Sequence, residues 1–414
     1  VMPVPAPYPR DREIPWTQVD FGPPRRLDTA RLQRIWSSWF QLTAAAHNPV
    51  LSGHAPLLLQ LLGAFPGDPL PLPYCALIAR SRTREHLARQ ARRDDFRSPT
   101  PALIAEQTGE PGWRVLADET GRWQQQTPDR QIILIALLAQ LGLHQQVTQL
   151  VGTLTADRGS RTRQHLLYEA ARSVRQHNRR STLPAGIFSW LAQEGTAPAL
   201  RVLSCTQLIS IAHRDNHRLE SHPDWTLLAT RLMDELAAEP AWVAALVTSR
   251  LHRALALDHV RRRDRDAAGA SLREASTWCE QARLAAGSAL ETHCSRENRM
   301  LVLEATVKAG TALHSEAELD IQLRDLIALA PTSPEPLFHA ARLMEQLDRP
   351  QQAAEIYEQA ANSATMRGAE AAHQAALCWS RAGQPDRAAT AAQLLHDLDP
   401  TATTPIEMTD LAHH

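Results

Sequence analysis

The most conspicuous shortage in this chain of 414 residues is lysine. Lys308 is the only one, and the other 43 basic side chains are arginines. The sequence therefore lacks a G-x-x-x-x-G-K-[ST] loop, which excludes a phosphate-binding loop of that type. A Schiff-base lysine or a kinase-type phosphate lysine could only be Lys308, and no glycine-rich segment accompanies it. A GC-rich coding bias, which favours arginine codons, is the simplest cause of this imbalance.

Glycine and aromatic residues are also scarce, with 17 glycines and 5% aromatic side chains. Ala, Leu, Arg, Gln and Glu dominate instead, and because these residues favour helices the composition predicts an all-α protein. The cysteines form no C-x-x-C pair, so we expect small buried side chains in a reducing compartment and no disulfide frame or zinc site. The five are Cys75, Cys205, Cys279, Cys294 and Cys378.

Long apolar runs are missing as well. The longest, 132–138 and 56–65, are far shorter than the roughly 20 residues that span a bilayer. Residues 1–15 are rich in proline and charge, which predicts no secretory signal. The formal net charge of −1 gives no general attraction to nucleic acid or to anionic membranes. We therefore expect a cytoplasmic protein without membrane contact.

Proline and turn signals divide the chain into five predicted regions. Residues 1–27 hold seven prolines, and because proline fixes φ and removes a backbone donor, an extended arm is predicted there. Apolar pieces broken by Pro-Gly and Gly-Asp-Pro turns predict an irregular helical region over 28–125. Helical hairpins are predicted over 126–331, two regular repeats over 332–400, and a tail over 401–414.

The two predicted repeats superpose with an offset of 35 residues. Each combines a helix, a short polar turn (347–350 and 382–385) and a second helix, with small residues where the helices must cross closely. The matched positions are Leu337, Ala340, Ala341, Met344, Asp348, Ala353, Tyr357 and Ala360 in the first repeat and Ala372, Ala375, Ala376, Trp379, Gly383, Ala388, Ala392 and Leu395 in the second. This spacing resembles the tetratricopeptide repeat, a helix–turn–helix unit of 34 residues.

A weaker match lies upstream, where apolar residues keep the same relative spacing around a turn at 141–144. These residues are Leu134, Ile135, Leu138, Gly142, Val147, Val151 and Leu154. Further helices are predicted at 163–177, 184–194, 198–213, 224–238, 240–263, 266–286 and 296–312. The resemblance implies an all-α solenoid of helical hairpins, preceded by the irregular helical region and the proline-rich arm.

In the family that the chain resembles, the first helix of each repeat lines a concave groove that holds a peptide or an extended segment. The resemblance implies such a groove at Glu335, Phe338, His339, Arg342, Glu370, His373, Gln374 and Leu377. Phe338 is expected to be an apolar anchor and Arg342 a charged donor, exposed on one surface with His373. The set lacks the repeated Lys and Arg pairs that clamp a C-terminal carboxylate in some members of the family.

Two polar clusters are candidates for further sites. His213, Asp215, His217 and His222 hold potential metal ligands, but no Glu follows the first His as in H-E-x-x-H, so a polar helix end is predicted and no metal. A basic patch is formed by Arg261, Arg262, Arg263 and Arg265. Arginines late in a helix more often complement its dipole than bind phosphates, which disfavours a nucleic-acid partner.

Together these patterns predict a helical-repeat interaction protein. It binds a protein or peptide partner as a scaffold or as an accessory or regulatory subunit, and no cofactor is predicted. One alternative is an enzyme or enzyme subunit whose site lies in residues 1–125, with substrate recruited by the repeats. A second alternative is a nucleic-acid-linked regulator that uses the arginine patch.

Overall fold

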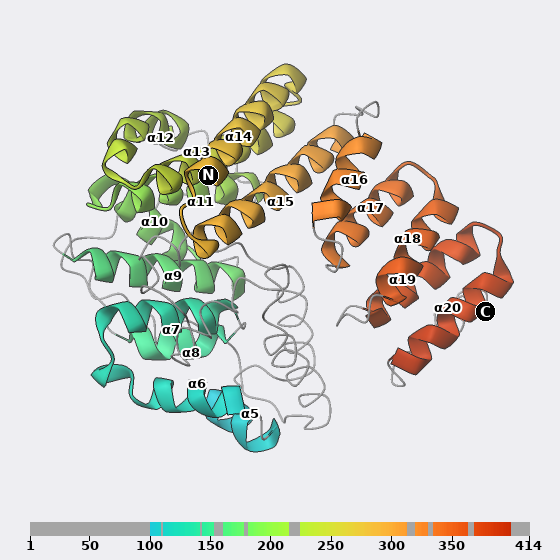
Figure 1. Ribbon diagram of the computed structural model, residues 1–414, viewed down its shortest axis with the longest axis horizontal. Coiled ribbons are helices and arrows are strands. Elements are labelled where there is room, and N and C mark those ends of the chain that lie inside the picture. Colours follow the sequence, from blue (N-terminus) through green and yellow to red (C-terminus); the bar gives the residue numbers. More distant parts are fainter. Residues whose placement is uncertain are drawn as a thin grey trace. The chain divides into compact units, whose positions relative to one another are not determined.

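The computed structural model describes residues 100–108, 111–140, 143–152, 160–177, 181–214, 224–312, 319–329, 334–362 and 368–398. In these ranges every regular element is a helix and there is no strand, which confirms the all-α class (Figure 1). None of these helices is long and apolar enough to cross a membrane. The predicted arm, the predicted tail and residues 28–99 of the irregular region lie outside the described residues.

The chain forms two compact units, Val1–Val302 and Leu303–His414. The described helices of the first unit are α5 (Pro101–Thr108), α6 (Pro111–Gly121), the 3-10 helix η2 (Trp123–Gln125), α7 (Pro128–Gln140), α8 (His144–Val151), α9 (Arg161–His177), α10 (Leu183–Glu194), α11 (Pro198–Arg214), α12 (Trp225–Leu232), the 3-10 helix η3 (Met233–Ala238), α13 (Ala241–Arg261), α14 (Arg265–Ala285) and the first part of α15 (Ala289–Ala312). The seven helices predicted between 163 and 312 are confirmed.

The start of α15 is the largest difference from the predicted bounds, since the helix begins at Ala289 and not at 296. A reciprocal cap sets this start. The N–H of Glu291 donates to Ser288 Oγ at 3.2 Å, and the N–H of Ser288 donates to Glu291 Oε2 at 3.0 Å. This is the S-x-x-E capping box, which satisfies two donors that a helix start leaves open. The signal was present in the sequence.

In the second unit, each helix from α16 to α20 packs on the next one along the chain (Figure 1). After the last part of α15, these helices are α16 (Leu319–Leu329), α17 (Pro334–Gln346), α18 (Pro350–Asn362), α19 (Gly368–Arg381) and α20 (Pro385–Leu398). The small residues predicted at close crossings are buried: Ala341 and Ala353 are 0% exposed, and Ala376 is 2% exposed. Without bulky side chains at these positions, the helix backbones can approach closely.

The α17–α18 and α19–α20 hairpins close with the same backbone hydrogen bonds at the predicted offset. The N–H of Arg349 donates to the carbonyl of Met344 at 2.8 Å, and the N–H of Gln384 donates to the carbonyl of Trp379 at 3.0 Å. The preceding residues, Asp348 and Gly383, have φ of +54° and +69°. This is the Schellman closure, in which one left-handed residue ends a helix and reverses the chain.

The same closing bond recurs twice in the first unit. In α7–α8 the N–H of Leu143 donates to the carbonyl of Leu138 at 2.9 Å, at the register that the apolar spacing indicated. In α13–α14 the N–H of Asp264 donates to the carbonyl of His259 at 2.9 Å, and Arg263 has φ of +58°. A left-handed conformation costs most L-residues about 1–2 kcal/mol.

The helices α13 and α14 were predicted, but their register with the C-terminal repeats was not. Ala256 and Ala268, 1% and 0% exposed, have the same separation as Ala341 and Ala353. This alanine spacing was the signal that could have identified the hairpin as a further copy of the unit.

Replacing Ala376 by leucine should destabilise the second unit by about 1–3 kcal/mol, because the added side chain has no space at a close helix crossing. Urea denaturation followed by circular dichroism measures the change. Ala389→Leu, at an exposed position of α20, is the control and should change stability by less than about 0.5 kcal/mol. Equal stability of the two variants would contradict close packing at Ala376.

Candidate functional site

The first helices of the two C-terminal hairpins carry one shared polar surface. Arg342 Nη2 of α17 lies 3.9 Å from Glu370 Oε1 of α19, with side-chain exposures of 53% and 22%. One and two turns further along α19 follow His373, Gln374 and Leu377, which share the Glu370 side of the helix by their spacing. Leu377 is 36% exposed. We call Arg342, Glu370, His373, Gln374 and Leu377 the α17/α19 face.

The predicted exposure of Phe338 is wrong. Its side chain is 1% exposed and lies edge-to-face on Tyr357 of α18, with ring centroids 5.4 Å apart. In the next repeat, His373 corresponds to Phe338 and Ala392 corresponds to Tyr357. His373 therefore has no aromatic ring opposite it on the second helix. Phe338 is therefore part of the hydrophobic core, and the apolar member of the exposed surface is Leu377.

His339 is also largely buried, with 9% exposure, and contacts a carboxylate on α15. Its Nε2 lies 3.4 Å from Glu304 Oε1, and Lys308 Nζ donates to the same oxygen. His339 thus ties α17 to the end of α15 and is not an accessible groove residue. Glu335 lies at the start of α17, where the structure does not describe its side chain.

The pKa of His373 is lowered by partial burial, while the nearby carboxylate of Glu370 opposes this shift. The imidazole is therefore neutral near pH 7, since its ordinary value is already about 6.5. At that pH the α17/α19 face presents one positive group, one negative group, a neutral imidazole, an amide and an aliphatic side chain. Such a surface can form hydrogen bonds and an apolar contact, but it contains no nucleophile paired with a base.

The other polar side chains of these repeats hold the hairpins together. Tyr357 Oη donates to Glu345 Oε1 at 2.7 Å, and Arg381 donates to the second oxygen of that carboxylate. Trp379 Nε1 donates to Glu358 Oε1 at 2.6 Å, and the guanidinium of Arg387 lies 3.9 Å above the indole ring. Because these groups contact one another, they stabilise the unit rather than form a binding surface.

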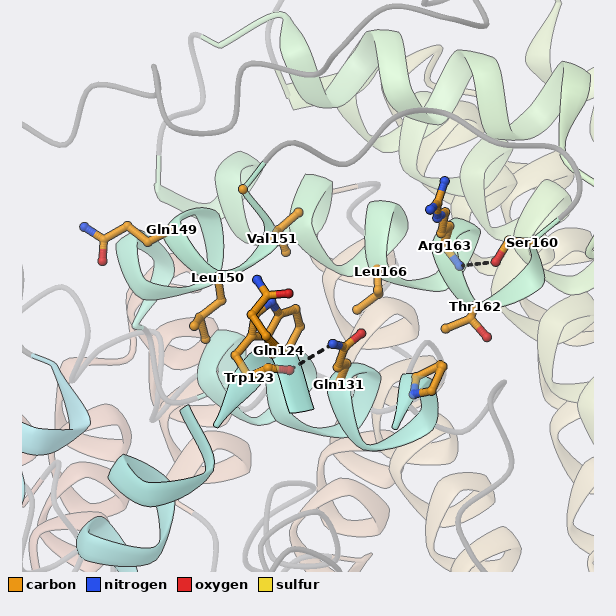
Figure 2. Close-up of a pocket in the computed structure, with 12 residues that line it drawn as sticks. Trp123, Gln124, Gln131, Gln149, Leu150, Val151, Ser160, Thr162, Arg163 and Leu166 are labelled. Carbon is orange, nitrogen blue, oxygen red and sulfur yellow. Dashed lines mark hydrogen bonds between the residues drawn. The ribbon is translucent and has the colours of Figure 1, made fainter. Parts of the chain in front are cut away.

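A cavity of about 460 Å³ lies in the first unit, between η2, α7, α8 and α9 (Figure 2). It is lined by Trp123, Gln124, Pro128, Gln131, Gln149, Leu150, Val151, Gly152, Ser160, Thr162, Arg163 and Leu166. Gln131 Nε2 donates to the carbonyl of Trp123 at 3.0 Å, which fixes one wall. None of these lining residues is Asp, Glu, His or Cys, so the lining lacks the usual groups for acid–base or thiol chemistry.

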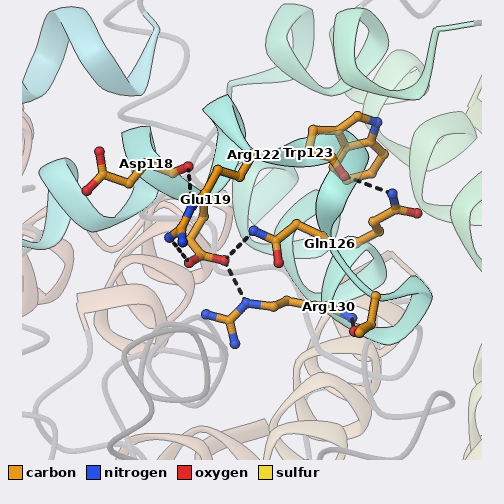
Figure 3. Close-up of polar contacts among 8 residues, drawn as sticks. Asp118, Glu119, Arg122, Trp123, Gln126 and Arg130 are labelled. Atoms are coloured by element: carbon orange, nitrogen blue, oxygen red, sulfur yellow. Dashed lines mark hydrogen bonds and ion pairs between the residues drawn. The ribbon is translucent and has the colours of Figure 1, made fainter.

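A buried carboxylate next to this cavity joins α6 to α7 (Figure 3). Glu119, with a 7% exposed side chain, accepts hydrogen bonds from Arg122 Nη2 at 3.0 Å, Gln126 Nε2 at 2.9 Å and Arg130 Nε at 2.6 Å. Two guanidinium groups and an amide offset the cost of burying this charge. The cluster holds in place the segment that carries Trp123, and it is structural rather than catalytic.

Helix α9 carries a row of buried polar side chains. Arg172 Nη1 donates to Glu169 Oε1 at 2.7 Å, and its guanidinium lies 5.6 Å from the ring centre of Tyr168. The imidazole of His165 is 1% exposed, and its Nδ1 has no hydrogen-bond partner in the described part of the chain. Burial, assisted by the charge of Arg161, lowers the pKa of His165 to about 3.

The predicted basic patch lies at the turn between α13 and α14, where all four arginines are exposed. Arg262 Nη2 pairs with Asp258 Oδ2 at 2.6 Å, and the carboxylate of Asp264 accepts from the N–H of Ala267 at 3.0 Å as the cap of α14. The patch therefore lies on a helix hairpin tip.

Of the predicted polar cluster around His213, the residues Asp215, His217 and His222 lie outside the described residues. In the part that the structure describes, no three His, Cys, Asp or Glu side chains are grouped so that they could hold a metal ion. Cys205, Cys279, Cys294 and Cys378 are buried free thiols, as predicted, and Cys75 lies outside the described residues. Of residues 1–125, the region of the enzyme alternative, only 100–108 and 111–125 are described.

No family model matches the sequence of this chain, and no curated protein matches it either.

The buried His165 should make stability depend on pH. Between about pH 6.5 and pH 3 the unfolded chain binds a proton that the folded chain does not. The contribution of this site to stability therefore falls as the pH falls, by up to about 1.4 kcal/mol per pH unit.

His165→Gln should reduce this slope, measured by urea denaturation at several values between about pH 7 and pH 5. Gln393→Ala, at an exposed position of α20 that carries no titratable group, is the control and should leave the slope as it is. An identical slope for the native chain and His165→Gln would contradict the neutral, buried imidazole.

Proposed function

We propose that this chain is a helical-repeat interaction protein, similar to tetratricopeptide-repeat proteins, that binds an extended peptide or protein segment on the α17/α19 face. In that role it acts as a scaffold or an accessory subunit in the cytoplasm. The recurrence of one hairpin closure in α7–α8, α13–α14, α17–α18 and α19–α20 supports a repeat architecture. Stacked hairpins of this kind present extended surfaces to other chains.

The observation that carries the proposal is the exposure of the Arg342 and Leu377 side chains. Arg342 is half-exposed, and its distance of 3.9 Å from Glu370 is long for an ion pair. Exposed pairs contribute only about 0–1 kcal/mol, so Arg342 can exchange Glu370 for a partner carboxylate at little cost. Leu377 is one of the few large apolar side chains exposed in the described residues.

These groups suit a segment with a carboxylate and an apolar side chain. The carboxylate would pair with Arg342, whose guanidinium offers two parallel N–H donors. The amide of Gln374 can donate to and accept from the backbone of an extended peptide. An aliphatic side chain of the partner would cover Leu377. The neutral His373 would repel neither a positive nor a negative side chain of the partner.

Peptides selected by phage display on the immobilised full chain should lose at least about tenfold in affinity when Arg342→Ala and Leu377→Ala are combined, because anchors at an interface typically contribute more than about 1 kcal/mol each. Fluorescence anisotropy with the selected peptides measures this loss.

The matched control combines Gln393→Ala and His396→Ala, two exposed positions of α20 in the same unit. It should bind like the native chain, and both double variants should keep the native circular dichroism spectrum. Equal affinity of the two double variants, or no selected peptide at all, would rule out the α17/α19 face as a peptide site.

A further inference from the structure

The turn between α13 and α14 has an arginine where a glycine would form the turn at lower conformational cost. Arg263 has φ of +58°, as Asp348 and Gly383 have φ of +54° and +69° at the same position of their hairpins. Glycine adopts this conformation freely, and aspartate tolerates it because its short side chain can bond to the nearby backbone. The long side chain of arginine offers no such local compensation.

No contact of the Arg263 side chain with a described residue offsets this strain. That side chain is exposed and makes no ion pair with any described residue, and the same holds for Arg261. The nearest carboxylates along the chain have other contacts, since Asp258 pairs with Arg262 and Asp264 caps α14. Two guanidinium groups at one hairpin tip therefore remain for a contact outside the described part of the chain.

We propose that this tip is a docking point for an acidic protein segment, and that Arg263 remains in a strained conformation because it makes this contact. Residues held in such strained backbone conformations cluster at active sites, ligand-binding sites and switch regions. The α13–α14 tip lies in the first unit, so the proposal is independent of the α17/α19 face.

The charge pattern favours a protein segment over nucleic acid. Arg261, Arg262 and Arg263 are consecutive, but Asp258 precedes them by one helical turn and Asp264 and Asp266 flank Arg265. The tip therefore offers a small group of cations bordered by carboxylates rather than a long positive stripe. A protein that binds duplex DNA through about 6–10 contacts with the phosphates needs more basic side chains than this tip carries. Guanidinium groups pair bidentately with carboxylates, so a short run of Glu or Asp side chains fits the tip.

The test uses the full chain, a fluorescently labelled oligoglutamate peptide and a labelled DNA duplex, at low ionic strength where exposed charge pairs are least screened. Arg263→Gly should raise the urea midpoint of unfolding and, at the same time, lower the affinity for oligoglutamate by about fivefold or more. Arg263→Lys keeps the charge but not the paired donors, so it should lose part of this affinity.

Two variants serve as controls. Asp348→Gly relieves the same backbone conformation in the second unit, and the combined Gln393→Ala and His396→Ala variant changes exposed positions of α20 outside both proposed surfaces. Both should bind oligoglutamate like the native chain. The proposal is overturned if Arg263→Gly gains no stability, if it binds oligoglutamate like the native chain, or if the DNA duplex binds more tightly than oligoglutamate with the same dependence on Arg263.

Discussion

The described hairpins depend on how each first helix ends. At the end of α13, α17 and α19 one residue in a left-handed conformation reverses the chain, and the next N–H closes the turn on a carbonyl of the last helical turn. The turn sets the register between the two helices, which places alanine opposite alanine and lets the backbones approach. In α13–α14, α17–α18 and α19–α20 the closure occurs together with small residues, whereas α7–α8 has the same closing bond with Ile135 and Val147 at the corresponding positions.

The sequence predicted this part of the fold well because it rests on local signals. Amphipathic spacing, helix-forming composition and turn residues predicted the helices, and the offset of the C-terminal repeats reappears in their hydrogen bonds. The burial of Phe338 could not be predicted in the same way, because it depends on the residue that faces this side chain across the hairpin. The Phe338 ring packs on Tyr357 in the core, whereas at the equivalent place His373 faces the smaller Ala392 and is partly exposed.

The buried charges were equally hard to foresee. Glu119, Glu169 and Arg172 look like ordinary surface residues in the sequence, yet each is buried beside a partner of opposite charge. Their burial follows from how helices distant in sequence pack, and no local pattern encodes it. Arginines thus have more than one role among the described residues: Arg130 of α7 pairs with the buried Glu119 of α6, Arg172 pairs with Glu169 within α9, and exposed arginines at the α13–α14 tip and on α17 can reach other molecules.

The near absence of lysine gives the position of Lys308 a practical value. Its side chain is 43% exposed on the part of α15 that belongs to the second unit, next to the carboxylate that also contacts His339. Because no other side chain in the sequence carries a primary amine, an amine-reactive fluorophore on a side chain can attach at this single place. The chain thus carries a built-in attachment point for a spectroscopic probe, and energy transfer from it to a labelled ligand would give a distance without any engineered cysteine.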